Sequence, residues 1–293
     1  MNAACALFRV TSFQKYQRIK YKTKMIIDFH THIFPDQIAE STIKHLTILG
    51  DIPPFSDGTV NGLLEKMEIA GVDVSVVLPV ITKPKQFDSV NRFAAEVNQE
   101  FRNKKRRLIS FAGIHPDCED IPGKMEFIRK SGFLGVKVHP DYQQTYFDDE
   151  KYVEIVRCAK ENDLIVITHA GVDAGYRNCS VRCTPDRVVN LLDKVEHSKL
   201  VLAHMGGHLM YQDVMDKLCG RDIYLDTSYV LRTIGEENFK KILSLHGEDK
   251  ILFASDSPWS PIHVDVELIK SFVPNEQTQK KIFSENAIKL LGL

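Results

Sequence analysis

MIIDFHTH, residues 25–32, joins a short run of large apolar residues to two histidines at its carboxyl end. A short apolar run of this kind, with β-branched and aromatic residues, is typical of a strand that is buried on both faces. Residues two apart on a strand face the same side, so His30 and His32 point in one direction. The segment therefore predicts a buried strand that ends in two imidazoles directed at one place.

Seven further segments of this kind follow along the chain. They recur with a mean spacing of about 32 residues, the length of one strand plus one crossover helix. The stretches between them place apolar residues at intervals of three and four, as amphipathic helices do. Eight such repeats predict an α/β fold, a single (β/α)8 TIM barrel over residues 25–293. The seven segments are VSVVLPV (74–80), RLISFAGIHP (107–116), FLGVKVHP (133–140), LIVITHAG (164–171), KLVLAHMGG (199–207), IYLDTSY (223–229) and KILFASDSP (250–258).

An open, doubly wound sheet is the alternative that uses the same elements. That fold normally carries a Gly-rich phosphate loop directly after its first strand. The corresponding stretch here, HTHIFPD at residues 30–36, contains no glycine. We therefore expect a closed barrel, in which functional residues gather at the carboxyl ends of the strands.

The composition of the 293-residue chain is that of a globular protein. Hydrophobic residues make up 43% and charged residues 26%, which excludes a disordered or fibrous chain. The 38 basic and 39 acidic residues leave a formal charge of −1, so no global field attracts nucleic acid or an anionic membrane. No uncharged apolar run reaches the ~18 to 20 residues that a membrane helix needs. We expect a small-molecule substrate and no nucleic-acid or membrane partner, and the sequence is compatible with a homo-oligomer.

Residues 1–24 differ from the rest of the chain. They contain six basic residues, no acidic residue and no helical apolar stripe. An organelle presequence is also poor in acidic residues but favours Arg and Ser, and the apolar stretch here is too short and polar for a secretory signal. We expect a basic, disordered extension before the domain.

The six cysteines are scattered over a chain long enough to need no disulfides, which favours reduced thiols in a cytoplasmic enzyme. Cys179 and Cys183 have a C-x3-C spacing that could form half of a zinc site. No second Cys or His pair lies nearby in the sequence, so we assign them no metal role.

Chemically active side chains occupy the last positions of the predicted strands. The first strand ends in His30 and His32, the fifth in His169 and the eighth in Asp256, and closure of the barrel sets the eighth strand beside the first. Three imidazoles and a carboxylate suit zinc or another divalent transition metal. Two solvated histidines and a helix-capping Asp256 are the alternative interpretation. Further polar residues at the strand ends are His115, Lys137, His139, His204 and Asp226.

Six motifs resemble, in order, those of the amidohydrolase superfamily over Met25 to Leu293. The resemblance is strongest to its amidohydrolase-related branch, which includes the aminocarboxymuconate semialdehyde and resorcylate decarboxylases and a lactonase. It implies a divalent metal, which we expect to be zinc, bound by His30, His32, His169 and Asp256, with Asp256 and His204 as the catalytic residues. The motifs are HTH (30–32), GVKVHP (135–140), THAG (168–171), AHMGG (203–207), LDTS (225–228) and SDSPW (255–259).

Lys137 decides the expected number of ions. In two-metal relatives a carboxylated lysine on the fourth strand bridges the ions, and Lys137 lies near that place. A free Lys137 could instead pair with a substrate carboxylate. We favour the free lysine and one ion, with two ions if Lys137 is carboxylated. His139 and His115, which each precede a proline at a strand end, are tentative substrate-binding or bridging residues, or caps of a turn.

These residues predict a metal-dependent hydrolase that attacks an amide, ester or lactone of a small molecule with activated water. The alternative is a non-oxidative decarboxylase of a small carboxylic acid, for example an aromatic one. A barrel that only binds a metal or a partner is disfavoured by the complete ligand set. A metal-dependent nuclease is disfavoured by Lys137, which stands where such enzymes carry glutamate.

Overall fold

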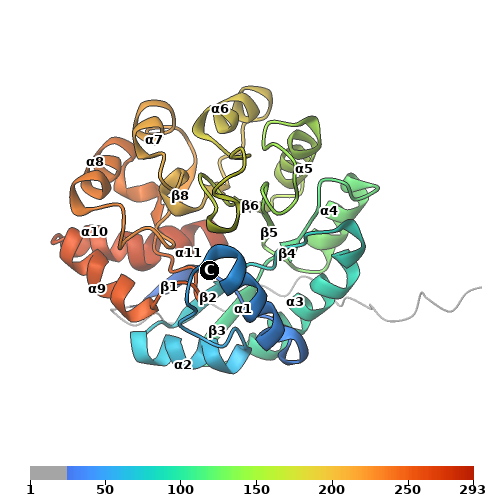
Figure 1. The fold of residues 1–293 in the computed structure, drawn as a ribbon, viewed down its shortest axis with the longest axis horizontal. Helices are drawn as coiled ribbons and strands as arrows, with labels where there is room; N and C mark the ends of the chain where they lie inside the picture. The colour runs from blue at the N-terminus through green and yellow to red at the C-terminus, as the bar shows by residue number, and fades with distance from the viewer. Residues whose placement is uncertain (1–24) are drawn as a thin grey trace, which may run out of the picture.

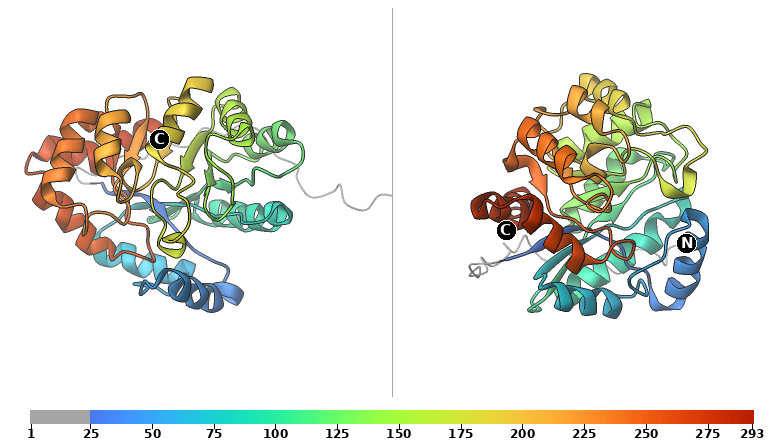
Figure 2. Two further views of the ribbon diagram at one scale, coloured as in Figure 1. Left: turned by 45° about the horizontal axis from the view of Figure 1, so that its top comes forward. Right: turned by 60° about the vertical axis from the view of Figure 1, so that its left-hand side comes forward.

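The computed structural model describes residues 25–293, and the predicted extension at 1–24 lies outside them. Strands surround one centre and helices form an outer layer (Figures 1 and 2). The strands are β1 (Ile27–Thr31), β2 (Val74–Val77), β3 (Arg107–Ser110), β4 (Ala112–Gly113), β5 (Gly135–Val138), β6 (Ile165–Thr168), β7 (Leu200–Leu202), β8 (Tyr224–Asp226) and β9 (Ile251–Leu252). The α-helices are α1 (Asp36–Gly50), α2 (Val60–Ala70), α3 (Phe87–Phe101), α4 (Ile121–Lys130), α5 (Glu150–Glu161), α6 (Pro185–Lys194), α7 (Tyr211–Lys217), α8 (Glu236–His246), α9 (Ile262–Phe272), α10 (Glu276–Lys280) and α11 (Asn286–Leu291).

All neighbouring strands are parallel and follow in chain order, as β1 to β3 in one arc and β4 to β9 in another. β3 and β4 are separated only by Phe111 and together form the third predicted strand. At the other junction, Phe29 N donates to Phe253 O (2.9 Å) and Asp256 N donates to His30 O (2.8 Å), which joins β1 to the segment after β9. The predicted (β/α)8 barrel is therefore confirmed, with an interruption in the third strand that the sequence pattern did not predict.

The barrel interior explains how β1 presents its histidines. Ile27 and Phe29 pack in the interior apolar cluster with side chains from six of the other strands. Strict alternation would turn His30 and His32 away from that side, but the register between β1 and β2 shifts between Asp28 and Thr31. An irregularity of this type redirects the side chains that follow it. Strand β1 therefore packs Ile27 and Phe29 in the barrel interior and also presents both histidines at one end of the barrel.

The helices begin where local signals favour them. Thr184 caps α6 by accepting a hydrogen bond from Arg187 N, and Pro185 occupies the first helical position. Residues of α1, among them Ile38, Thr42 and Leu46, line the same cavity as His30. Within residues 25–293, no helix has the length and apolar character needed to cross a membrane.

Gly171, the last residue of the motif THAG (168–171), is a position where a side chain cannot fit. Its φ is +85°, and a Cβ atom there would lie 2.1 Å from His208 N. Gly171→Ala is expected to lower the free energy of unfolding by about 2 to 5 kcal/mol, because left-handed strain and overpacking add. Urea denaturation measures this loss.

Gly132→Ala is the matched control, because Gly132 has the same φ of +85° with no heavy atom within 4 Å of the added Cβ. It should lose only the strain of about 1 to 2 kcal/mol. Equal losses in the two variants would show that the close approach to His208 N has no energetic consequence.

Candidate active site

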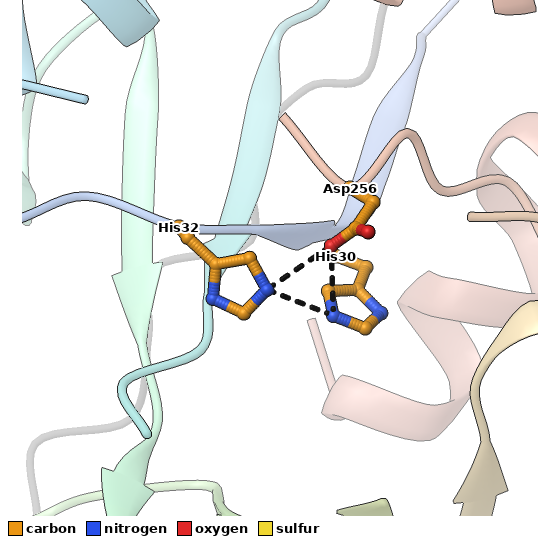
Figure 3. A group of neighbouring side chains, drawn as sticks. All are labelled: His30, His32 and Asp256. Atoms are coloured by element: carbon orange, nitrogen blue, oxygen red, sulfur yellow. Dashed lines mark hydrogen bonds and ion pairs between the residues drawn. The ribbon is translucent and has the colours of Figure 1, made fainter. Parts of the chain in front are cut away.

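His30, His32 and Asp256 meet at one end of the barrel and form what we call the His-His-Asp triad (Figure 3). His30 lies on β1, His32 follows that strand, and Asp256 lies in the segment after β9. The two Nε2 atoms are 3.2 Å apart, and Asp256 Oδ1 lies 3.1 Å from His32 Nε2 and 3.4 Å from His30 Nε2. Three of the four predicted ligands are therefore brought together.

These distances fit a metal ion. Ligands bound tetrahedrally at about 2.0 to 2.2 Å from a zinc-like ion lie about 3.3 to 3.6 Å from one another. The three distances of the triad, 3.1 to 3.4 Å, match the edges of such a tetrahedron to within a few tenths of an ångström. The donor set thus suits a divalent ion, and zinc as the particular ion stays a prediction.

Hydrogen bonds fix the ring orientation of both histidines. His30 Nδ1 donates to Asp226 Oδ2 (2.8 Å), and His32 Nδ1 donates to Leu78 O (2.7 Å). Because the proton of each neutral ring sits on Nδ1, each Nε2 presents its lone pair to the triad. Partners of this kind are typical of metal-ligating histidines.

The protonation states also suit cation binding. Burial, reinforced by the charge of Lys137, holds the pKa of His30 well below its usual value. Burial works to raise the pKa of Asp256, but the neighbouring His30 and His32 outweigh it and the pKa is lowered. A neutral imidazole and an ionised carboxylate are the forms that bind metal.

His169, the fourth predicted ligand, lies beside the triad and is grouped with His139 and Asp173. Its Nδ1 is 3.0 Å from His204 Nε2. The His204 ring in turn stacks on His30, with ring centroids 5.5 Å apart. The structure therefore connects His169 to the triad through His204. To bind an ion at the triad, His169 Nδ1 would have to exchange its hydrogen bond with His204 Nε2 for a bond to the ion.

His204 is held by the segment after β8. Its Nδ1 donates to Ser228 O (3.0 Å), and Ser228 Oγ donates to Asp226 Oδ1 (2.5 Å). Asp226 therefore supports both His30 and the segment that holds His204. In the neutral ring this leaves His204 Nε2 as an acceptor at the site, which suits a residue that handles protons.

Backbone strain is concentrated at the same strand ends. His204, Tyr229 and Asp256, which follow β7, β8 and β9, have φ values of 60°, 66° and 71°. A non-glycine residue in this region costs of the order of 1 to 3 kcal/mol and persists where surrounding structure enforces it, often at functional sites. This strain supports the assignment of this end of the barrel as the active site.

Lys137, on β5, has its side chain buried beside the triad. Its exposed fraction is 1%, and its Nζ donates to His30 Nε2 at 3.1 Å. Burial lowers its pKa to about 8. Within residues 25–293 no carboxylate oxygen lies within the 4 Å of an ion pair with it. The site thus contains a buried amine without an anionic partner.

The two tentative histidines differ in their surroundings. His139 stacks on His169 with centroids 4.3 Å apart and planes inclined by 11°. His115 Nδ1 accepts from Asp117 N at 3.1 Å, which is the turn-capping role considered from the sequence. Both remain at the site, His139 in contact with a predicted ligand and His115 at the wall.

A cavity of about 1100 Å³ covers this end of the barrel. Aromatic residues, among them Tyr142, Tyr229 and Trp259, form part of its wall. Every site residue predicted from the sequence lines it, namely His30, His32, His115, Lys137, His139, His169, His204 and Asp256. The structure places them in one cavity, and their individual roles stay predictions.

Sequence reasoning missed the supporting carboxylates. Asp226 stands at a predicted strand end with no role assigned to it, Asp141 lies in the turn after β5, and Asp173 is the N-cap of the short 3-10 helix Ala174–Tyr176. The sequence offers one signal for Asp141: the tripeptide His-Pro-Asp occurs at 115–117 and again at 139–141, each time with its His and Pro as the last two residues of a predicted strand. Tyr229 gave no local signal, because its φ cannot be predicted from its neighbours.

The chain belongs to the amidohydrolase family, whose model matches residues 27–293. The resemblance of the six motifs is thereby confirmed. No curated protein sequence matches the chain significantly.

Solved structures similar to this chain share its fold. One is 5-carboxyvanillate decarboxylase from Novosphingobium aromaticivorans, complexed with manganese and 4-hydroxy-3-methoxy-5-nitrobenzoic acid, with 17% identity, 92% of this chain and 97% of that chain covered, and a TM-score of 0.68. Another is 2,6-dihydroxybenzoate decarboxylase from Rhizobium, with 17% identity, coverages of 92% and 99% and a TM-score of 0.66. A third is a probable 2-pyrone-4,6-dicarboxylic acid hydrolase from Acinetobacter baumannii, with 18% identity, coverages of 92% and 100% and a TM-score of 0.65.

Proposed function

We propose that this amidohydrolase-family protein is a metal-dependent decarboxylase, which removes CO2 from a small aromatic or otherwise unsaturated carboxylic acid. The observation that carries the proposal is the buried amine of Lys137 beside the His-His-Asp triad, which donates to His30 Nε2 but has no carboxylate oxygen of residues 25–293 within 4 Å. A buried charge needs a partner, and a carboxylate is the usual one for lysine. The Lys137 amine is therefore suited to bind the substrate carboxylate that would leave as CO2.

Metal binding and carboxylate binding are linked at His30. Its Nε2 has one lone pair, which serves Lys137 in this structure. The same lone pair is needed for an ion in the triad, so Lys137 then requires a new acceptor. A substrate carboxylate at the ion would provide it, which favours a free Lys137 and one ion.

An ion held by His30, His32 and Asp256, with His169 as the predicted fourth ligand, would supply a Lewis acid that polarises substrate oxygens. Asp256, whose lowered pKa keeps it ionised, would accept a proton from a substrate hydroxyl and return it to the carbon that bears the carboxylate. The bond from that carbon to the carboxylate then breaks, its electron pair stays with the substrate, and CO2 leaves. His204 Nε2, an acceptor in the neutral ring, is the second candidate to take the hydroxyl proton and return it to that carbon.

The neighbours support the class of substrate. Two similar structures are of decarboxylases that are named for aromatic acids. In this chain, Tyr142, Tyr229 and Trp259 give the cavity flat walls that suit a planar molecule.

Hydrolysis of an amide, ester or lactone is the second candidate. The ionised state of Asp256 favours it too, because the same carboxylate could take a proton from water. One similar structure is of a probable hydrolase of a dicarboxylic acid.

An isotope experiment tests the proposed reaction. Metal-loaded protein is incubated with a panel of aromatic and unsaturated carboxylic acids, lactones and amides, in D2O and separately in H2¹⁸O. We expect CO2 release with deuterium at the carbon that lost the carboxylate. Incorporation of ¹⁸O into a new carboxylate without CO2 release would contradict decarboxylation and select hydrolysis.

Lys137→Met is expected to lower kcat/KM for a carboxylic acid substrate by about 10- to 100-fold, the effect of losing one hydrogen bond to a charged group. Metal content should stay at one equivalent if Lys137 is free. Steady-state kinetics and elemental analysis measure the two quantities.

Lys151→Met is the matched control, because Lys151 also lines the cavity but is paired with Asp117 (2.6 Å) and should change kcat/KM little. A fall from two equivalents of metal to one or none in Lys137→Met would indicate a carboxylated lysine instead.

A further inference from the structure

We propose that Asp141 is a positioning residue that selects the tautomer of His169 and thereby prepares His169 Nδ1 to bind the metal ion. The inference rests on the proposed function, because only a metal site gives His169 this role. It concerns a carboxylate in the turn after β5, outside the predicted ligand set.

Asp141 and His169 face each other with unmet hydrogen-bonding capacity. Asp141 is 2% exposed and His169 is 5% exposed. Within residues 25–293, neither Asp141 Oδ2 nor His169 Nε2 has a hydrogen-bond partner. The two atoms are 3.8 Å apart, which is too far for a hydrogen bond. Buried polar atoms without partners are rare and costly, so this pair requires an explanation.

The tautomer of His169 can be assigned from its neighbours. His204 Nδ1 faces the carbonyl oxygen of Ser228 and must carry the proton of the neutral ring. His204 Nε2 is therefore an acceptor, and His169 Nδ1, 3.0 Å away, must be the donor to it. The neutral His169 ring then has no proton on Nε2. Two acceptors, a ring nitrogen and a carboxylate oxygen, face each other with no proton between them.

Ligation through His169 Nδ1 removes this conflict. When the Nδ1 lone pair is used for a ligand bond, the ring proton sits on Nε2 and can be donated to Asp141 Oδ2. Metal-ligating histidines generally donate their second ring N–H to a carboxylate or carbonyl, which fixes the tautomer and increases the basicity of the ligand. Asp141 is placed to be that carboxylate.

The rest of the Asp141 side chain is already held. Its Oδ1 accepts from Arg182 N at 3.2 Å and lies 3.6 Å from Arg182 Nη1. Only Oδ2 is left for His169. The carboxylate is thus fixed in place by Arg182 while its second oxygen is directed at the ring.

A second ion bound by His139, His169 and Asp173 would be another explanation. It conflicts with the hydrogen bonding of His139, whose Nδ1 accepts from Tyr142 N at 3.4 Å. The proton of the neutral ring is then on Nε2, which faces Asp173 Oδ2 at 3.5 Å. With this proton in place, His139 Nε2 has no lone pair for an ion. The geometry therefore favours Asp141 as a partner of His169 over a second ion.

Asp141→Asn tests the inference. Asparagine keeps the size and the oxygen that accepts from Arg182 N, but its amide can donate to His169 Nε2 and stabilise the tautomer that cannot ligate. We expect the affinity for Zn²⁺ or Mn²⁺, measured by competition with a chelator, to fall about 10- to 100-fold. The metal-free variant should melt at the same temperature as the metal-free wild type or higher, because both unpartnered atoms acquire a hydrogen bond.

Asp117→Asn is the matched control, since Asp117 ends the other His-Pro-Asp tripeptide but is half-exposed and paired with Lys151. It should leave metal affinity unchanged. If the wild type binds neither ion, the proposed function fails and the inference with it. If the wild type binds but Asp141→Asn binds equally tightly, only the inference fails. A lower melting temperature of metal-free Asp141→Asn would likewise overturn it, since that indicates a purely structural role.

Discussion

Replacement of Asp256 by asparagine is expected to lower kcat by about 10²- to 10⁴-fold, the usual contribution of a general acid/base residue. Asparagine keeps one oxygen that can still contact an ion held by His30 and His32, but it cannot accept a proton at neutral pH. It also tolerates the φ of +71° at this position, so the backbone should be undisturbed. Part of the metal and all of the fold should therefore remain. Steady-state kinetics, metal analysis and a melting curve measure the three effects.

The alternative interpretation of Asp256 as a helix cap makes the opposite prediction. Asparagine caps a helix about as well as aspartate, so a pure cap would show turnover within a few-fold of the wild type. Asp149→Asn is the control, because the Asp149 side chain caps α5 and accepts from Lys151 N away from the triad. Should Asp256→Asn behave like this control, the proton chemistry would move to His204.

Removal of the metal is expected to abolish turnover, by about 10³-fold or more, because Lewis-acid catalysis contributes several kcal/mol. Purified protein should contain about one equivalent of divalent metal per chain. Dialysis against a chelator should remove both metal and activity, and it should lower the melting temperature because an ion that binds only the folded state stabilises it. Elemental analysis, kinetics and calorimetry measure these changes.

The ion that restores activity identifies the type of site. Two imidazoles and a carboxylate suit Zn²⁺ or Mn²⁺, whereas Ca²⁺ and Mg²⁺ prefer oxygen ligands, so the former should restore turnover and Ca²⁺ should not. Full activity of metal-free protein would refute the mechanism as a whole. Two equivalents of metal in the active protein would instead support a carboxylated Lys137.

The sequence alone predicted the barrel and most of the residues at its functional end. Each of the eight predicted strands is present, because a buried strand followed by an amphipathic helix is encoded locally by the spacing of apolar residues. The pairing of His30 with His32 was predictable for the same reason, since a period of two is a property of the strand itself. Closure of the barrel then placed Asp256 beside them from a separation of more than two hundred residues, as expected from the strand count.

The tertiary structure decided how these residues are protonated and held. The register shift in β1 that lets both Phe29 and His30 face inward depends on pairing with β2. The contact of Asp226 with His30 and of Lys137 with His30 joins residues 196 and 107 positions apart. No local pattern encodes such contacts, because they depend on which side chains meet when the strands close into a ring. The sequence thus determined which chemical groups gather at one end of the barrel, and only the packed structure determined which ring nitrogen carries a proton and which charge lacks a partner.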